Sequence, residues 1–137
     1  MRLDPVLEAV IQSEVLARAL AEAAAEKKAF DITILDLRGL VAYTDVFVIC
    51  SARNRRQVQA IADEVRKVAK EKYSLYAKGA EGLEAARWVL VDFGAVVVHV
   101  FDEPMRGFYN LDGLWGDAPR LPAPETPAVE GETSIYL

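Results

Sequence analysis

The feature that most constrains the fold is a pair of apolar runs separated by a single glycine turn. The runs are "WVLVDF", residues 88–93, and "AVVVHVF", residues 95–101, with Gly94 between them. Valine and aromatic residues are enriched in strands, and two strands joined by so short a link pair antiparallel. The pattern predicts a β-hairpin whose second strand alternates faces. Val96, Val98 and Val100 would share one face, and Val97, His99 and Phe101 the other.

Helical spacing precedes and interrupts further strand-like runs. Residues 4–28 have apolar side chains three and four apart after Asp4-Pro5, a favourable helix start, and form either one long helix or two short ones. Residues 54–72 have the same amphipathic spacing. Additional strands are expected at 31–37, 45–51 and 73–79, and a short irregular helix after Pro104.

This order predicts an α/β domain with a mixed five-stranded sheet flanked by helices. The long helix after the second strand allows a parallel crossover to the third. The 137 residues suit one domain, which we expect to span residues 1–117. Residues 118–137 contain four prolines and several acids, and this composition predicts a disordered tail.

Charge and composition limit the classes of function. The net charge of −5 argues against a protein that wraps nucleic acid with a wholly basic surface. No apolar run reaches the ~18 residues that a membrane span needs, and the N-terminus does not resemble a signal peptide. We therefore expect a cytoplasmic protein without a membrane partner. The single cysteine, Cys50, lies in an apolar run and is expected to be a buried, inert thiol.

The most suggestive catalytic pattern does not hold. Asp92-Phe93-Gly94 matches a protein-kinase triplet, but neither a glycine-rich loop nor a His-Arg-Asp catalytic loop precedes it. We interpret it as a strand end and the hairpin turn. His99 is the only histidine, without partners for a zinc site, so it is expected to be a structural or interface residue.

A metal-dependent nucleotidyltransferase is the main enzymatic alternative. Such a centre needs carboxylates two residues apart on one strand, and the only such pair is Glu130 and Glu132 in the predicted tail. The strand-to-helix turn "SARNRRQ", residues 51–57, also lacks the glycines of a phosphate loop. The sequence thus predicts no catalytic residue, no metal and no cofactor.

The same turn is rich in arginine. Arg53, Arg55 and Arg56 gather at a helix start, and residues 53–72 hold seven basic residues against three acidic ones. This can be a solvated helix face. It can also be a contact for RNA, phosphate or an acidic partner.

Six stretches in order resemble the ribosomal silencing factor family, also called the Iojap family. They cover nearly all of residues 14–116, and the part from Trp88 to Trp115 is the most specific. The stretches are "KKAFDITILDL" (27–37), "TDVFVIC" (44–50), "RQVQAIADEV" (56–65), "EG" (81–82), "WVLVDFGAVVVHVF" (88–101) and "RGFYNLDGLW" (106–115).

The resemblance implies a fold similar to that of nucleotidyltransferases but without the catalytic carboxylates. It also implies a non-enzymatic translation repressor that binds the large ribosomal subunit through the ribosomal protein numbered fourteen. There it would block association with the small subunit when nutrients are scarce. Homodimers and contacts to adjacent ribosomal RNA are further expectations.

By position, the resemblance implies a partner-binding surface of Trp88, Phe93 and His99, with Glu81 and Asp92 as nearby polar contributors. Aromatic side chains commonly dominate the energetics of such surfaces. Each residue also has a structural interpretation, since Trp88 can belong to the core and Asp92 can cap the hairpin. Tyr109 and Trp115 are expected to dock the last helix on the sheet. The chain departs from the family at Ser51-Ala52, where a Thr-Gly pair is common, and at Arg53, where a small polar residue is common.

Overall fold

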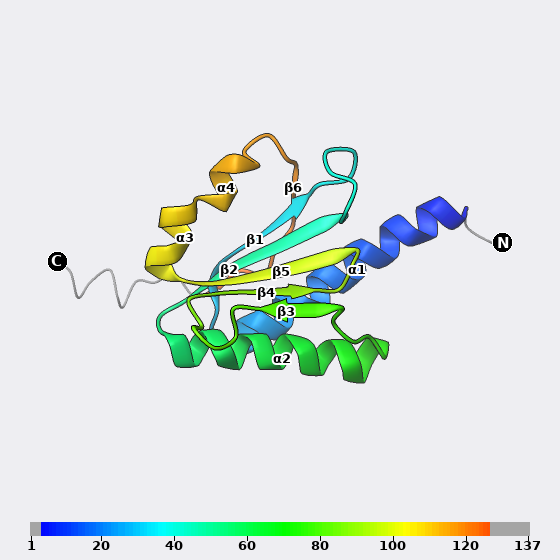
Figure 1. Cartoon of the computed structure of the whole chain (residues 1–137). Helices are drawn as coiled ribbons and strands as arrows, with labels where there is room; N and C mark the ends of the chain where they lie inside the picture. Colours follow the sequence, from blue (N-terminus) through cyan, green and yellow to red (C-terminus); the bar gives the residue numbers. More distant parts are fainter. Residues whose placement is uncertain (1–3, 127–137) are drawn as a thin grey trace.

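The computed structural model describes residues 4–126, except for the side chains of residues 6–11. These residues form four helices and one six-stranded sheet, with strand order β3-β4-β5-β2-β1-β6 (Figure 1). In chain order the elements are α1 (Pro5–Glu26), β1 (Phe30–Asp36), β2 (Val46–Ala52), α2 (Arg55–Tyr73), β3 (Gly79–Glu81), β4 (Trp88–Asp92), β5 (Val96–Asp102), α3 (Glu103–Tyr109), α4 (Leu111–Leu114) and β6 (Arg120–Leu121).

The hairpin predicted from the sequence is confirmed. β4 and β5 pair antiparallel with Leu90 opposite His99, and Gly94 makes the turn with φ of +86°, a conformation that favours glycine. The expected parallel crossover exists, but its partner differs from the prediction. β2 pairs in parallel with β5, whereas β3 lies at the edge of the sheet and contacts only β4 in the sheet order.

Helices α1 and α2 cover one face of the sheet. Val46, Val48 and Cys50 of β2 and Val96 and Val98 of β5 point into this layer, where every one of them is fully buried. The facing helix residues include Leu20, Ala21 and Ala24 of α1 and Val58, Ile61, Ala62 and Val65 of α2. We call this the helix-covered face. The predicted amphipathic spacing of α2 therefore describes its packing, and residues 5–26 form the single-helix alternative.

The third predicted strand is displaced along the chain. Residues 74–78 of "YSLYAKG" lie outside strands, and β3 begins at Gly79. Ser74 ends α2 in the left-handed conformation with φ of +51°, and its N–H donates to carbonyls of the last helical turn. Residues 75–78 then lead the chain from the end of α2 to the edge of the sheet, where β3 pairs with β4.

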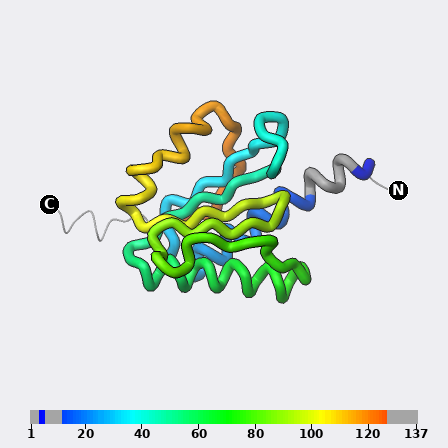
Figure 2. The backbone as a smooth tube through the Cα atoms, viewed as in Figure 1, coloured from blue at the N-terminus to red at the C-terminus, as the bar shows by residue number. Residues whose placement is uncertain are grey.

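The sixth strand lies beyond the domain boundary expected at residue 117. Ala118 is buried, and Leu121 of β6 pairs with Ile34 of β1 (Figure 2, where the orange segment returns beside the cyan strand). Asp36 N–H also donates to the Pro119 carbonyl at 2.8 Å. Prolines can flank so short an edge strand because few ladder hydrogen bonds are needed there. Residues 127–137 of the predicted tail lie outside the described residues, so their disorder stays a prediction.

No helix among the described residues is both long enough and apolar enough to cross a membrane.

Candidate functional site

The second face of the sheet carries most of the large rings. Along each strand, side chains that point to this face alternate with side chains that point to the helix-covered face, as expected for the two-residue period of a β-strand. We call this surface the aromatic face. Its apolar members are Leu35, Leu37, Phe47, Ile49, Val97, Phe101 and Ala118, with Val41, Trp88, Leu90, Met105, Leu111 and Trp115 partly buried beside them.

Trp88 and His99 form the polar centre of the aromatic face. The Trp88 Nε1–H donates to His99 Nδ1 at 3.1 Å. The indole stacks on Phe101 with ring centroids 4.9 Å apart and contacts Tyr109 at 4.7 Å. Phe47 meets the imidazole edge-on at 4.4 Å. Trp88 is thus neither wholly core nor freely exposed, since it is half-buried between the sheet and α3.

His99 is buried, with 3% of its surface exposed. Burial disfavours the imidazolium and lowers the pKa of His99 to about 4, so the ring is neutral at physiological pH. Its Nε2 is a buried side-chain atom without a hydrogen-bond partner in the described part of the chain. Its position is therefore compatible with the expected structural or interface histidine. The described part of the fold provides no hydrogen-bond partner for its second nitrogen, Nε2.

Helices α3 and α4 lie over one end of this face. Asp102 caps α3 by accepting from the Met105 N–H at 3.1 Å, and it also accepts from Arg87 Nε at 2.9 Å. Trp115 follows α4 and meets Phe47 edge-on at 6.4 Å. These contacts, with that of Tyr109 on Trp88, confirm that Tyr109 and Trp115 dock the last helical segment on the sheet.

Arg106 holds this segment in place, a role that its local sequence pattern did not predict. Its guanidinium pairs with Asp112 at 2.8 Å, and donates to Ser51 Oγ at 3.0 Å and Thr33 Oγ1 at 3.1 Å. It also donates to the Asp31 carbonyl. Burial acts to raise the pKa of the Asp112 carboxyl, but the hydrogen bond and the charge of Arg106, with smaller contributions from a backbone hydrogen bond and Arg120, together leave this pKa lowered. The arginine lies within "RGFYNLDGLW", but only the fold brings β1 and β2 within its reach.

A cavity of about 300 Å³ opens on the aromatic face. Its buried lining residues are Phe47, Val97 and His99. Its more exposed lining residues are Tyr43, Glu81, Leu90, Asp92, Leu111, Leu114 and Trp115. Tyr43 and Leu114 are 66% and 70% exposed, and Phe108 of α3 is 77% exposed. Such a concentration of exposed large apolar side chains is typical of an interaction surface.

The structure brings together most of the predicted surface residues, but not Phe93. Trp88, His99, Asp92 and Glu81 belong to the aromatic face or line its cavity. Phe93 is 5% exposed and belongs to the core of the helix-covered face, so it cannot share one surface with Trp88 and His99. Alternation along the strand is the reason, because Phe93 is five residues from Trp88.

Asp92 also has the structural role that the sequence suggested. Its Oδ1 accepts from the Gly94 N–H at 2.7 Å, which fixes the hairpin turn. Asp92 is half-buried and lines the cavity, as does the exposed Glu81.

The three candidate arginines lie elsewhere, at the start of α2. Arg53, Arg55 and Arg56 are exposed, and Asn54 between them caps the helix by accepting from the Gln57 N–H. The Arg53 guanidinium lies 5.5 Å from the centroid of the Phe30 ring. The cap is therefore a neutral amide, and the three arginines beside it lie on the surface of the fold.

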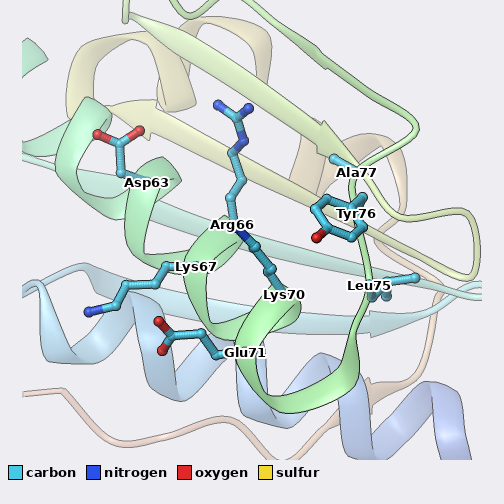
Figure 3. Close-up of a pocket in the computed structure, with 8 residues that line it drawn as sticks. All are labelled: Asp63, Arg66, Lys67, Lys70, Glu71, Leu75, Tyr76 and Ala77. Carbon is cyan, nitrogen blue, oxygen red and sulfur yellow. The ribbon is translucent and has the colours of Figure 1, made fainter.

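A second concentration of positive charge follows further along α2 (Figure 3). Arg66, Lys67 and Lys70 line an open groove of about 520 Å³ together with Tyr76, and the Lys70 ammonium lies 5.8 Å from the Tyr76 ring centroid. Asp63 and Glu71 line the same groove, so its charge is mixed.

Neither a metal cluster nor a reactive thiol is evident among residues 4–126. No group of three or more His, Cys, Asp or Glu side chains within that range could hold a metal ion. Glu130 and Glu132 lie outside the described residues. Cys50 is fully buried, and burial raises the pKa of its thiol to about 12, so it stays protonated.

The fold and this site define a small α/β domain with one closed face and one partly covered aromatic face. Comparison with known proteins gives the family. The chain belongs to the family described as ribosomal silencing factor during starvation, whose model matches residues 10–135.

Curated relatives agree with this assignment. The chain is 49% identical over 96 residues to the ribosomal silencing factor of Halalkalibacterium halodurans, covering 70% of this chain and 81% of that protein. It is 50% identical over 99 residues to that of Bacillus subtilis, covering 72% and 83%. The chloroplastic protein Iojap of Zea mays is 40% identical, covering 88% of this chain and 53% of the longer plant protein.

Solved structures support the fold. A crystal structure of a Bacillus halodurans protein matches with a TM-score of 0.70 at 42% identity, covering 80% of this chain and 98% of that one. An X-ray structure of a Chromobacterium violaceum protein matches with a TM-score of 0.73 at 32% identity, covering 85% and 95%.

Proposed function

We propose that this chain represses translation by binding the large ribosomal subunit and sterically blocking its association with the small subunit. The match to the ribosomal silencing factor model over residues 10–135 carries the proposal. The regulatory names of the relatives favour a protein that acts by binding rather than by catalysis. The likeness to the nucleotidyltransferase fold remains a prediction.

The docking surface in this proposal is the aromatic face. Trp88 and His99 lie at its centre, and Tyr43 and Leu114 are exposed beside its cavity. Glu81 and Asp92 place carboxylates at the edge, which suits a basic partner such as the ribosomal protein numbered fourteen. Phe93 would contribute only indirectly, by packing behind the hairpin.

Co-sedimentation with isolated large subunits tests the proposal, together with a subunit-joining assay. The chain should pellet with large subunits at physiological salt and reduce joining. Tyr43→Asp and Leu114→Asp should weaken both effects, because each places a charge in a surface that would be desolvated. Tyr73→Asp is a matched control, since Tyr73 is 41% exposed at the end of α2 and lines neither the cavity of the aromatic face nor the groove beside α2.

The proposal would be contradicted if the chain neither pelleted with large subunits nor altered the joining of the two subunits. Binding that survives both Tyr43→Asp and Leu114→Asp would instead move the contact to another surface.

We also propose that the free protein forms a homodimer, as the family resemblance implies. Light scattering would distinguish a particle of twice the protomer mass of 15.1 kDa from a monomer. A monomer at all accessible concentrations would refute this part alone.

RNA contact through α2 is the second candidate function. Arg66, Lys67 and Lys70 form no ion pair within residues 4–126, and Tyr76 beside them offers an exposed ring on which a base could stack (Figure 3). Unpaired cations next to an aromatic side chain are typical of single-stranded RNA contacts.

Charge reversal separates this candidate from docking through the aromatic face. Arg66→Glu with Lys70→Glu should reduce affinity for large subunits and flatten its salt dependence if RNA is contacted. The pair Arg55→Glu with Arg56→Glu tests the other end of the helix. Unchanged binding and salt slope in both double variants would rule out α2 as an RNA contact.

A further inference from the structure

The hydrogen bond between Trp88 and His99 determines where the imidazole proton is. An indole Nε1–H can only donate, so His99 Nδ1 must be the acceptor at 3.1 Å and cannot carry a proton. A neutral imidazole has one N–H, which must then lie on Nε2. The tautomer follows from this contact, and it makes Nε2 a donor.

The Nε2–H of His99 has no acceptor in the part of the chain that the structure describes, although the atom is buried. Around the imidazole ring lie the rings of Phe47, Trp88 and Phe101, at centroid distances of 4.4, 6.0 and 6.3 Å. Aromatic carbon offers at most a weak acceptor. Because buried donors are nearly always satisfied, an unpaired one is destabilising for the free fold and needs a separate reason to be present.

The cavity on the aromatic face supplies such a reason. His99 is the polar member of the three buried residues that line it, beside Phe47 and Val97. The edge carries the carboxylates of Glu81 and Asp92. A Lys or Arg side chain entering the cavity would offer the Nε2–H only further donors and no acceptor. A carboxylate would be repelled by the negative charges of Glu81 and Asp92. The remaining match is a neutral oxygen, such as a backbone or side-chain carbonyl.

A partner atom can reach Nε2 only if side chains around the cavity move, because the nitrogen itself is buried. Leu111, Leu114 and Trp115 line the cavity, and none of the four residues of α4 is buried. Since α4 is one turn long and has no buried residue, we expect movements of its side chains beside the cavity to cost little free energy.

We propose that His99 is a specificity-determining donor whose Nε2–H bonds a neutral oxygen acceptor of the protein that docks on the aromatic face. This inference rests on the docking function proposed above. It adds the chemistry of the contact: a basic protein surface that presents a carbonyl-type oxygen to the cavity.

Two substitutions separate the two nitrogens. In His99→Asn the side-chain oxygen can replace Nδ1 as the acceptor for Trp88, but nothing reaches the position of Nε2. In His99→Gln the longer amide can place an N–H there. We expect His99→Asn to lower affinity for isolated large subunits about tenfold, the effect of losing one buried hydrogen bond, and His99→Gln to recover most of it. Equal affinity of His99→Asn and the wild-type chain would overturn the inference.

Nitrogen NMR gives a test that does not depend on the variants folding. His99 is the only histidine, so the imidazole signals of the labelled full chain come from one residue. The free chain should have the Nε2–H tautomer. Adding the purified ribosomal protein numbered fourteen should shift the Nε2 signal and slow exchange of its proton with water.

A free chain with the proton on Nδ1 would contradict the inference. So would a complex that forms while the Nε2 signal and its exchange stay unchanged. Failure of the wild-type chain to bind either the purified protein or large subunits is a different result, because it overturns the docking function and this inference with it.

Discussion

The two faces of the sheet differ in how completely the fold covers them. The helix-covered face is lined mainly by alanine, valine and other aliphatic side chains, and two long helices close it. The aromatic face carries Phe47, Trp88, Phe101 and Trp115, and only the short helices α3 and α4 lie over it. Neither of these short helices contains a buried residue. The helix-covered face is therefore buried within the fold, whereas part of the aromatic face stays exposed and accessible to a partner.

Residue size explains part of the difference. Small side chains such as Ala21, Ala24 and Ala62 let long helices approach the sheet closely, so the packing there is continuous. Large rings leave gaps that a seven-residue and a four-residue helix cannot fill, and the cavity beside His99 is one such gap. We therefore expect substitutions in the helix-covered face to change the free energy of unfolding strongly and binding little. Substitutions on the aromatic face should change binding strongly and the free energy of unfolding little.

Ile61→Ala should have the largest effect on stability. Ile61 is fully buried in α2 against the sheet, so the change removes apolar contact and leaves a cavity. We expect the free energy of unfolding to fall by about 2–5 kcal/mol. Urea denaturation followed by circular dichroism measures this loss. A loss below about 1 kcal/mol would mean that the helix-covered face is packed less closely than the structure indicates.

Acidification should have the next largest effect, and His99 should be its origin. Its pKa is about 4 in the fold against about 6.5 when unfolded. The unfolded chain therefore binds the proton more readily, and stability present above pH 6.5 is lost as the pH falls towards 4. The full loss is about 3 kcal/mol.

Thermal unfolding between pH 7 and pH 4 tests this loss, with His99→Gln as the matched control. The variant cannot titrate in this window, so its stability should change less. Asp36 and Asp112 do not confuse the result, because the fold lowers the pKa of each carboxyl below its ordinary value, mainly through Arg38 and Arg106 respectively. Parallel curves for the wild-type chain and His99→Gln would show that the imidazole is not the group responsible.

Leu114→Ala should have the smallest effect on stability. The side chain is 70% exposed, so truncation should change the free energy of unfolding by no more than about 0.5 kcal/mol. Affinity for large subunits should fall measurably, because a contact of the aromatic face is lost. A variant that is clearly destabilised, or that binds like the wild-type chain, would contradict the prediction that Leu114 contributes to binding rather than to stability.

Local pattern was sufficient for much of the fold. The hairpin at Gly94, the fully buried second strand and the amphipathic α2 all follow from periodicities of two and 3.6 residues. The same alternation already separates Phe93 from Trp88, whereas the family resemblance relates residues by their position in the chain and not by the face of the sheet. Residues 118–121 were missed because composition describes what a segment can bury alone, not which strand edge is nearby.

By itself, the sequence determined the alternation that puts His99 and Phe101 on one face, the aromatic content of the last helical segment and the resemblance to ribosomal silencing factors. Only the tertiary structure decided that β5 lies parallel to β2, that Arg106 bridges α3 to β1 and β2, and that Trp88 donates to His99. These depend on contacts between residues far apart in the chain, which no local period encodes. The tautomer of the single histidine is one consequence, because it is set by a partner on the neighbouring strand.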